Sequence, residues 1–203
     1  MPSAPLSNFH KNLQKLNFTR ERMERLYRTD RIALRDLHSV YEALFIRGVT
    51  SFEVFLQDQF VSVMNGKAVY KKVRGVSSRM TTASSDALTE ILLQGRPYLT
   101  WLPYEEHTHK RALLYLKDGK PFSDIQKPER ETMERITIIR NAIAHQSDHA
   151  IKKFNNKIIG TLVLLPQEKS PAGFLRSIFR AAPRHTRFEF YMTELGRIAT
   201  SVC

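Results

Sequence analysis

Apolar residues recur every three or four positions along most of the chain, and the alternation typical of β-strands is scarce. This spacing places apolar side chains on one face of a helix. The sequence therefore predicts an all-α protein. The expected helices cover about residues 8–28 (as one helix or two), 30–60, 85–95, 104–117, 128–145, 150–157 and 188–201.

The expected helix over 30–60 carries the longest apolar stripe of the chain. Asp30 is a candidate N-cap, because its carboxylate can accept hydrogen bonds from the first free backbone N–H groups. A second stripe widens the apolar face, which indicates a helix buried on two sides at the centre of a bundle. The two stripes together contain Leu34, Leu37, Tyr41, Leu44, Phe45, Gly48, Val49, Phe52, Phe55, Leu56 and Phe60.

The helical pattern fails over residues 65–84, where glycine, serine, threonine and basic residues gather. This composition predicts an exposed basic loop, either a solvated segment or one that follows RNA phosphates. The candidate RNA-binding residues are Lys67, Lys71, Lys72, Arg74 and Arg79.

The pattern also fails over residues 158–187. The apolar run 158–165 is compatible with a strand or a buried connection, and the proline- and arginine-rich stretch 166–187 is expected to be mostly irregular. We therefore expect an N-terminal helical extension over residues 1–29 and a helical domain over 30–203, with the basic loop as an insertion.

Composition adds a strong positive charge to this picture. The 203 residues carry 32 Lys and Arg against 20 Asp and Glu, a net charge of +12. Such a surplus favours a polyanionic partner, although it can also serve solubility alone. The single cysteine, Cys203, and the lack of a signal-peptide pattern or a bilayer-length apolar run predict a cytoplasmic protein with no membrane partner.

One motif carries candidate chemistry, Arg140-Asn141-x-x-x-His145, at the end of the expected helix 128–145. Arg followed by His at similar spacing also occurs at Arg31–His38 and Arg180–His185, so spacing alone is weak evidence. Only Arg140–His145 has an adjacent amide side chain and a strong helix before it.

Helical geometry does not direct Arg140 and His145 at one point. They lie about 140° apart around an ideal helix, and Arg140 falls within the apolar stripe. Three explanations are open: the Arg side chain wraps around, the helix ends before His145, or two copies of the motif form one site across a dimer. In the alternative, Arg140 is structural and forms a salt bridge to a neighbouring helix, for instance to Glu53.

These side chains suit the cleavage of RNA. Arg140 can hold a phosphate through its planar guanidinium and stabilise negative charge that develops on it. His145 can take the proton from a ribose 2′-hydroxyl or donate one to the leaving oxygen, and Asn141 can orient His145 or bind a phosphate oxygen. The nucleophile belongs to the substrate, so we expect neither a metal ion nor another cofactor.

The motif resembles the signature of HEPN domains, in which Arg, usually a polar residue, and then His follow at this spacing. The stretch 48–56 also resembles an early helix of HEPN groups associated with toxin–antitoxin and phage-defence systems, where an acidic residue often stands at the position of Glu53. The resemblance covers about residues 30–200 and implies a HEPN-like helical bundle that forms a homodimer. It implies a metal-independent endoribonuclease whose catalytic residues are Arg140, Asn141, His145 and Glu53.

Two other classes of function are open. HEPN proteins include non-catalytic RNA-binding or partner-binding modules, and the basic surface could instead meet a membrane, an acidic antitoxin or another regulatory protein. His107 and His109 lie near Glu105 and Glu106, but histidines two apart point to different sides of a helix, so a solvated helix start is the preferred interpretation. The arginine-rich segment 176–187 matches no part of the family pattern.

Overall fold

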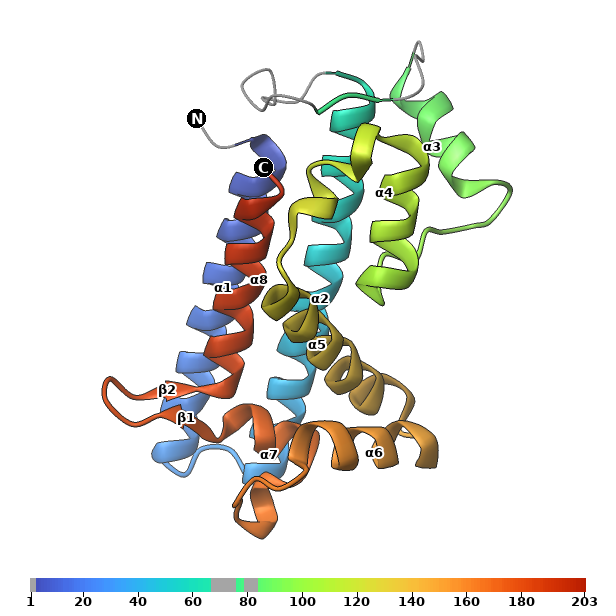
Figure 1. The fold of residues 1–203 in the computed structure, drawn as a ribbon. Helices are drawn as coiled ribbons and strands as arrows, with labels where there is room; N and C mark the ends of the chain where they lie inside the picture. The colour runs from blue at the N-terminus through green and yellow to red at the C-terminus, as the bar shows by residue number, and fades with distance from the viewer. Residues whose placement is uncertain (1–2, 67–75, 79–83) are drawn as a thin grey trace.

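A computed structural model describes residues 3–66, 76–78 and 84–203 of the chain. Helices make up most of this part, and its paired strands form one short hairpin (Figure 1). The prediction of an all-α fold is therefore confirmed. The helices pack around one continuous hydrophobic core.

The chain begins with a long helical hairpin. α1 (Ala4–Arg28) is a single helix, whose N-cap Ser3 accepts a hydrogen bond from the Leu6 N–H. α2 (Leu34–Met64) runs back along it. The predicted cap at Asp30 is wrong, because Ala33 is the N-cap of α2 and Asp30 lies in the turn with a φ of 52°. Aspartate tolerates this left-handed conformation, which lets the turn reverse the chain.

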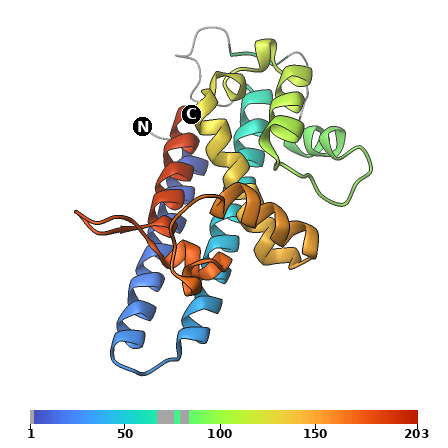
Figure 2. The same ribbon diagram turned by 60° about the horizontal axis from the view of Figure 1, so that its bottom comes forward.

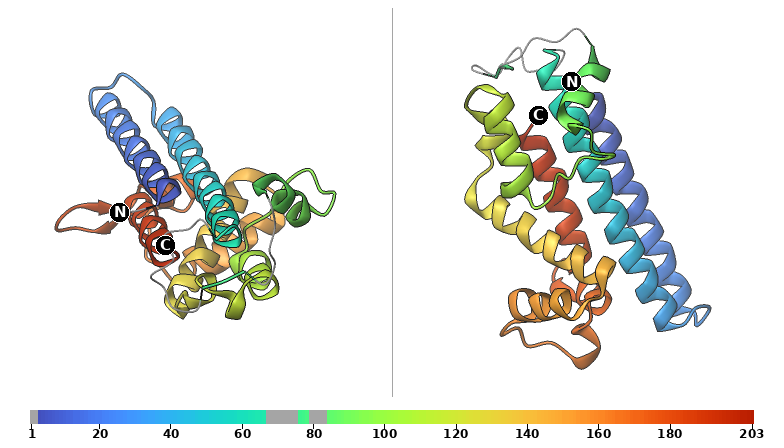
Figure 3. Two further views of the ribbon diagram at one scale, coloured as in Figure 1. Left: turned by 90° about the horizontal axis from the view of Figure 1, so that it is seen from above. Right: turned by 90° about the vertical axis from the view of Figure 1, so that its right-hand side faces the viewer.

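The last helix completes a layer with this hairpin. α8 (Arg187–Ser201) packs against both α1 and α2, so the two ends of the chain lie close together (Figures 1 and 3). Ser3 Oγ and Cys203 Sγ are 3.4 Å apart. Gly48 permits the close approach of α2 and α8, because a Cβ at this position would lie 2.6 Å from Met192 Sδ. The segment 1–29, expected as an extension, shares the core of the rest of the chain through Phe9, Leu13 and Leu16.

The helix that carries the motif, α5 (Lys127–His145), crosses α2 and also contacts α8. It is followed by α6 (Asp148–Phe154) and a π-helical turn (Asn155–Ile159), which agree with the helix expected over 150–157. The C-terminal end of α5 therefore lies next to α6 (Figure 1).

A smaller group of elements packs on the C-terminal half of α2. α3 (Ser85–Leu93) begins after its N-cap Ser84, and the helix expected over 104–117 consists of a π-helix (Tyr104–His109) and α4 (Lys110–Tyr115). Short 3-10 turns follow at Lys117–Gly119 and Phe122–Asp124. The rings of Phe60, Trp101 and Phe122 pack together at the centre of this group.

The prediction that residues 166–187 are mostly irregular is wrong. A 3-10 turn (Pro166–Glu168) leads to α7 (Pro171–Arg176), and β1 (Ile178–Arg180) pairs antiparallel with β2 (His185–Thr186) (Figure 2). Ser170 caps α7, and the buried Phe174 and Leu175 anchor it on α2. Of the apolar run before this segment, Ile158 and Ile159 are buried, but Val163 is fully exposed in an extended connection.

Among the described residues, no helix combines the length and the apolar character needed to cross a membrane.

Candidate functional site

The motif lies on the last turns of α5. The helix begins with a capping box in which the Glu129 carboxylate accepts a hydrogen bond from the Gln126 N–H. Its buried face contains Met133, Ile136, Ile139 and Ile143. The helix ends after His145 because Gln146 takes a left-handed conformation with a φ of 46°. Helical geometry therefore extends through the whole motif, which excludes the option of a helix that ends before His145.

Arg140 and Asn141 form a joined polar pair on this helix. Arg140 Nη1 donates a hydrogen bond to Asn141 Oδ1 over 3.0 Å, and both residues are half-buried. The bond restricts both side chains and leaves the other N–H groups of the guanidinium as further donors. The pair is thus oriented before any ligand arrives.

Glu53 of α2 lies within the electrostatic reach of Arg140. Burial raises the pKa of the Glu53 carboxyl, while the Arg140 charge and hydrogen bonds from the backbone N–H groups of Trp101 and Leu102 oppose this rise without cancelling it. The loop before the π-helix therefore holds the carboxylate from one side, and Arg140 acts on it from another. The structure brings together three of the four predicted catalytic residues.

His145 is exposed in the last turn of α5. It follows Asn141 by four residues, so the two side chains share one face of the helix, whereas Arg140 lies about 140° away around the axis. The bond to Asn141 nevertheless bends the Arg140 guanidinium towards this face, and no hydrogen bond joins Arg140 to His145 in the part of the chain that the structure describes.

An open groove lies directly beside the motif. Its volume is about 830 Å³, and it runs along α2 between Asn12 of α1 and the end of α5. We call it the motif groove. Its lining includes Ile46 and Val54 of α2 and Ile143 and Ala144 of the motif helix. Val54 is 55% exposed, so an apolar surface adjoins the motif without being covered in a single chain.

The candidate RNA-binding residues of the basic loop, Lys67, Lys71, Lys72, Arg74 and Arg79, lie outside the described residues.

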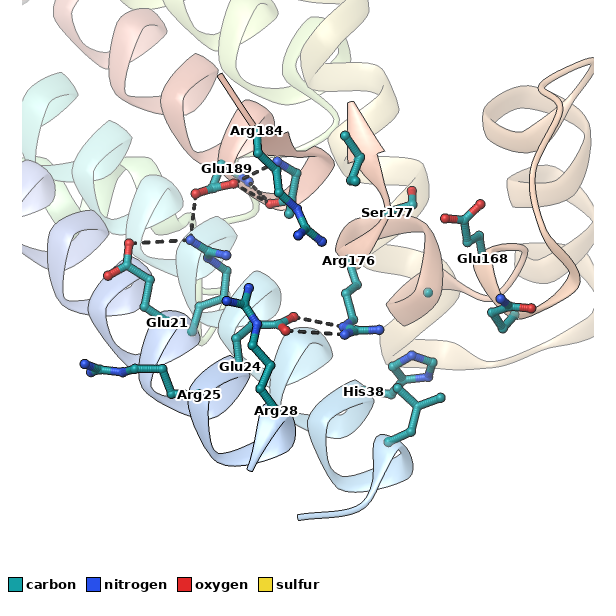
Figure 4. A pocket seen from close by; sticks show the side chains of 16 residues that line it. Glu21, Glu24, Arg25, Arg28, His38, Glu168, Arg176, Ser177, Arg184 and Glu189 are labelled. Carbon is teal, nitrogen blue, oxygen red and sulfur yellow. Dashed lines mark hydrogen bonds and ion pairs between the residues drawn. The ribbon is translucent and has the colours of Figure 1, made fainter. Parts of the chain in front are cut away.

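A second cavity was not foreseen from the sequence. It measures about 480 Å³ and lies between α1, the start of α2, α7 and the β1–β2 hairpin (Figure 4). We call it the arginine cavity. Five arginines and a histidine contribute to its lining, namely Arg20, Arg25, Arg28, Arg176, Arg184 and His38.

Glu24 is the central acid of the arginine cavity. Arg176 binds its carboxylate with two hydrogen bonds, of 2.9 and 3.3 Å, and the Tyr41 hydroxyl donates a third of 2.8 Å. Burial disfavours the charged carboxylate, but the hydrogen bonds from Arg176 and Tyr41 and the charges of Arg176 and Arg28 outweigh it, so the pKa of Glu24 is lowered. Burial and the Arg176 charge also lower the pKa of His38, although the Glu24 charge opposes them. His38 is therefore neutral at pH 7.

Two features of the sequence pointed to parts of this cavity. Arg31–His38 was one of the weaker Arg–His pairs, and the arginine-rich stretch 176–187 fitted no family pattern. The lining residues come from segments that are remote in sequence, so only the fold brings them together.

No group of three or more His, Cys, Asp or Glu side chains suited to a metal ion occurs in the part of the chain that the structure describes. His109 Nδ1 instead lies 3.0 Å from Glu105 Oε2 within the π-helix.

Comparison with protein-family models, with curated proteins and with solved structures finds no match to this chain.

Proposed function

We propose that this protein is a metal-independent endoribonuclease of the HEPN type, with a cleavage site formed by the motifs of two copies of the chain. The observation that supports this most is the polar cluster at the end of α5. There the Arg140–Asn141 pair lies near the Glu53 carboxylate, and an exposed His145 follows one turn later.

Each side chain has a distinct role in this proposal. Arg140 binds the scissile phosphate and stabilises the charge of the pentacovalent state. Neutral His145 removes the proton from the 2′-hydroxyl, and a protonated His145 donates to the 5′-oxygen as that bond breaks. Asn141 holds Arg140 through its side-chain oxygen. The Glu53 carboxylate on α2 acts on the guanidinium through its charge.

A second copy of the chain would place another His145 within reach of Arg140. In a symmetric dimer one surface packs on the same surface of the partner, so both motifs meet at the axis. The motif groove offers an uncovered apolar surface next to Ile143 and Ala144. Docking there would bring Arg140 of one chain towards the histidine of the other.

The substrate and setting follow from charge and chemistry. A net charge of +12 favours RNA, and a mechanism that uses the 2′-hydroxyl spares DNA. Such an enzyme fits a cytoplasmic toxin or phage-defence component, restrained by an acidic antitoxin or another regulatory protein.

The test is cleavage of a mixed RNA pool in the presence of EDTA. Wild type should release fragments with cyclic-phosphate ends, and Arg140→Ala and His145→Ala should abolish release while circular dichroism shows an intact fold. His149→Ala is the matched control, since His149 is exposed on α6 just beyond the motif and should remain dispensable. Activity that survives in folded Arg140→Ala or His145→Ala would refute the mechanism.

The second candidate is a non-catalytic RNA-binding module. The hydrogen bond that already engages Arg140 with Asn141 favours it, because the guanidinium has a structural partner in the single chain. Salt-sensitive RNA binding by wild type without cleavage would support this candidate over the ribonuclease.

A further inference from the structure

Two arginines of the arginine cavity point inward without a bound carboxylate. Figure 4 shows the guanidinium of Arg184 reaching from the hairpin towards Arg176, and that of Arg28 beside Glu24, whereas Arg25 points away. Among the residues drawn there, ion pairs join Arg20 to Glu21 and Glu189 and Arg176 to Glu24, but none involves Arg28 or Arg184. The cavity thus holds one cation of α1, Arg28, and one of the hairpin, Arg184, that form no direct ion pair with the carboxylates drawn there.

The acids of the cavity already have structural partners. The Glu189 carboxylate caps α8 through Thr186 and binds Arg20 at 2.6 Å. The Glu168 carboxylate accepts a hydrogen bond from the Leu165 N–H. With Glu24 held by Arg176 and Tyr41, these carboxylates are occupied, and an added anion would meet mainly donors.

A buried donor in the wall strengthens this view. Arg20 is only 7% exposed, lines the cavity and binds Glu189 through Nη2. Its Nε has no hydrogen-bond partner in the described structure. A buried N–H without an acceptor is unfavourable, and a water molecule or an ion at the wall would satisfy it.

We propose that the arginine cavity binds the terminal phosphate of a nucleotide-sized ligand. A phosphomonoester carries about two negative charges and three acceptor oxygens, which suit the guanidinium groups of Arg28 and Arg184. Neutral His38 offers one further donor and one acceptor at the wall. The volume of about 480 Å³ fits a ligand of this size.

This site is separate from the proposed cleavage site. None of Glu53, Arg140, Asn141 and His145 lines the arginine cavity. Binding there therefore does not depend on the ribonuclease proposal. The phosphate can come from a free nucleotide or from the 5′ end of an RNA, and both sources present the same group.

Calorimetric titration of the full chain tests the proposal and separates the sources. The probes are a mixture of nucleoside 5′-monophosphates, the matching nucleosides, and a short DNA-backbone oligonucleotide with and without a 5′-phosphate, which the proposed ribonuclease would not cut. We expect tighter binding of the phosphorylated member of at least one pair. The pair that responds identifies the source.

Three substitutions complete the test. Arg28 and Arg184 are exposed and outside any ion pair drawn in Figure 4, so Arg28→Ala and Arg184→Ala should fold, and each should weaken phosphate-dependent binding by roughly tenfold or more. Arg22→Ala is the control, because it removes the same charge from an exposed position of α1 that lies outside the cavity. Equal binding of phosphorylated and unphosphorylated probes would overturn the proposal, as would an equal loss in Arg22→Ala.

Discussion

Glu53 and Glu24 are partly buried acids whose pKa values shift in opposite directions, and this difference gives a test at the scale of single residues. The folded-state pKa of Glu53 is raised from 4.5, so its ionisation destabilises the native state as the pH rises through that pKa. Glu53→Gln keeps an acceptor for the Trp101 and Leu102 N–H groups without the charge. We therefore expect the melting temperature of Glu53→Gln, relative to that of wild type, to increase as the pH rises from below 4.5 to neutral.

The Glu53→Gln substitution should thus raise the melting temperature relative to wild type at neutral pH and lower the rate of RNA cleavage. Thermal unfolding across the pH range measures the first, and the EDTA cleavage assay measures the second. Under the proposed function, cleavage by Glu53→Gln falls because Arg140 loses its neighbouring carboxylate. A variant as active as wild type would remove Glu53 from the catalytic residues.

Glu24→Gln should behave in the opposite sense. The pKa of Glu24 is lowered, so its ionised form stabilises the native state above the unfolded value of 4.5, and this contribution disappears as the pH falls through the folded pKa. The variant loses the charge that binds Arg176 and should melt below wild type at neutral pH. The difference should shrink in acid, and a difference that is independent of pH would contradict the ionic role of Glu24.

At the scale of elements, glycines set how closely two pairs of segments approach. A Cβ at Gly173 of α7 would clash with the backbone oxygen of Gln167, whereas a Cβ at Gly48 would meet the flexible thioether of Met192. We expect Gly173→Ala to lower the free energy of unfolding by more than about 3 kcal/mol, because backbone must move. Gly48→Ala should lower it by about 1 kcal/mol, since improved helix propensity offsets part of the overpacking.

Urea denaturation of both variants measures these free energies. Similar losses of unfolding free energy in the two variants would mean that the backbone of the Pro166–Glu168 turn moves as readily as the Met192 side chain. Such a result would contradict the view that α7 is fixed by close backbone packing.

The elements also show what the sequence could and could not predict. Long amphipathic helices were predictable because α2 and α5 bury regular stripes such as Leu37, Tyr41 and Leu44. The predicted cap at Asp30 was wrong, and α7 and the β1–β2 hairpin were not predicted, because short segments depend on contacts with α2 and α8 more than on their own pattern. The sequence and the family resemblance predicted one site of Arg140, Asn141, His145 and Glu53, of which the structure relates Arg140 to Asn141 and Glu53. The arginine cavity needs segments that only tertiary packing brings together.

At the scale of the whole molecule, the proposed function depends on contact between two copies through the motif groove. Val54→Asp places a charge on its apolar lining, and Val54 is exposed enough to accept it without loss of the fold. We expect the variant to be monomeric in analytical ultracentrifugation and inactive on RNA. Val163→Asp is the control, because Val163 is fully exposed in the connection before α7 and lies outside the groove.

A shared site makes a further prediction about mixtures of inactive variants. If each cleavage site takes Arg140 from one chain and His145 from the other, Arg140→Ala and His145→Ala should be inactive alone. After dissociation and reassociation in equal amounts, half of the dimers are mixed and each contains one complete site, so activity should return to about a quarter of the wild-type rate.

The same mixture distinguishes a shared cleavage site from one that lies within a single chain, because no chain in the mixture carries both Arg140 and His145. Activity would then stay absent, whereas monomers that exchange freely would still give mixed dimers in the ultracentrifuge. Adding Val54→Asp to both variants is the decisive control, since it should prevent recovery without touching either catalytic residue. Recovery that persists with Val54→Asp would locate the dimer contact on another surface and leave the shared site intact.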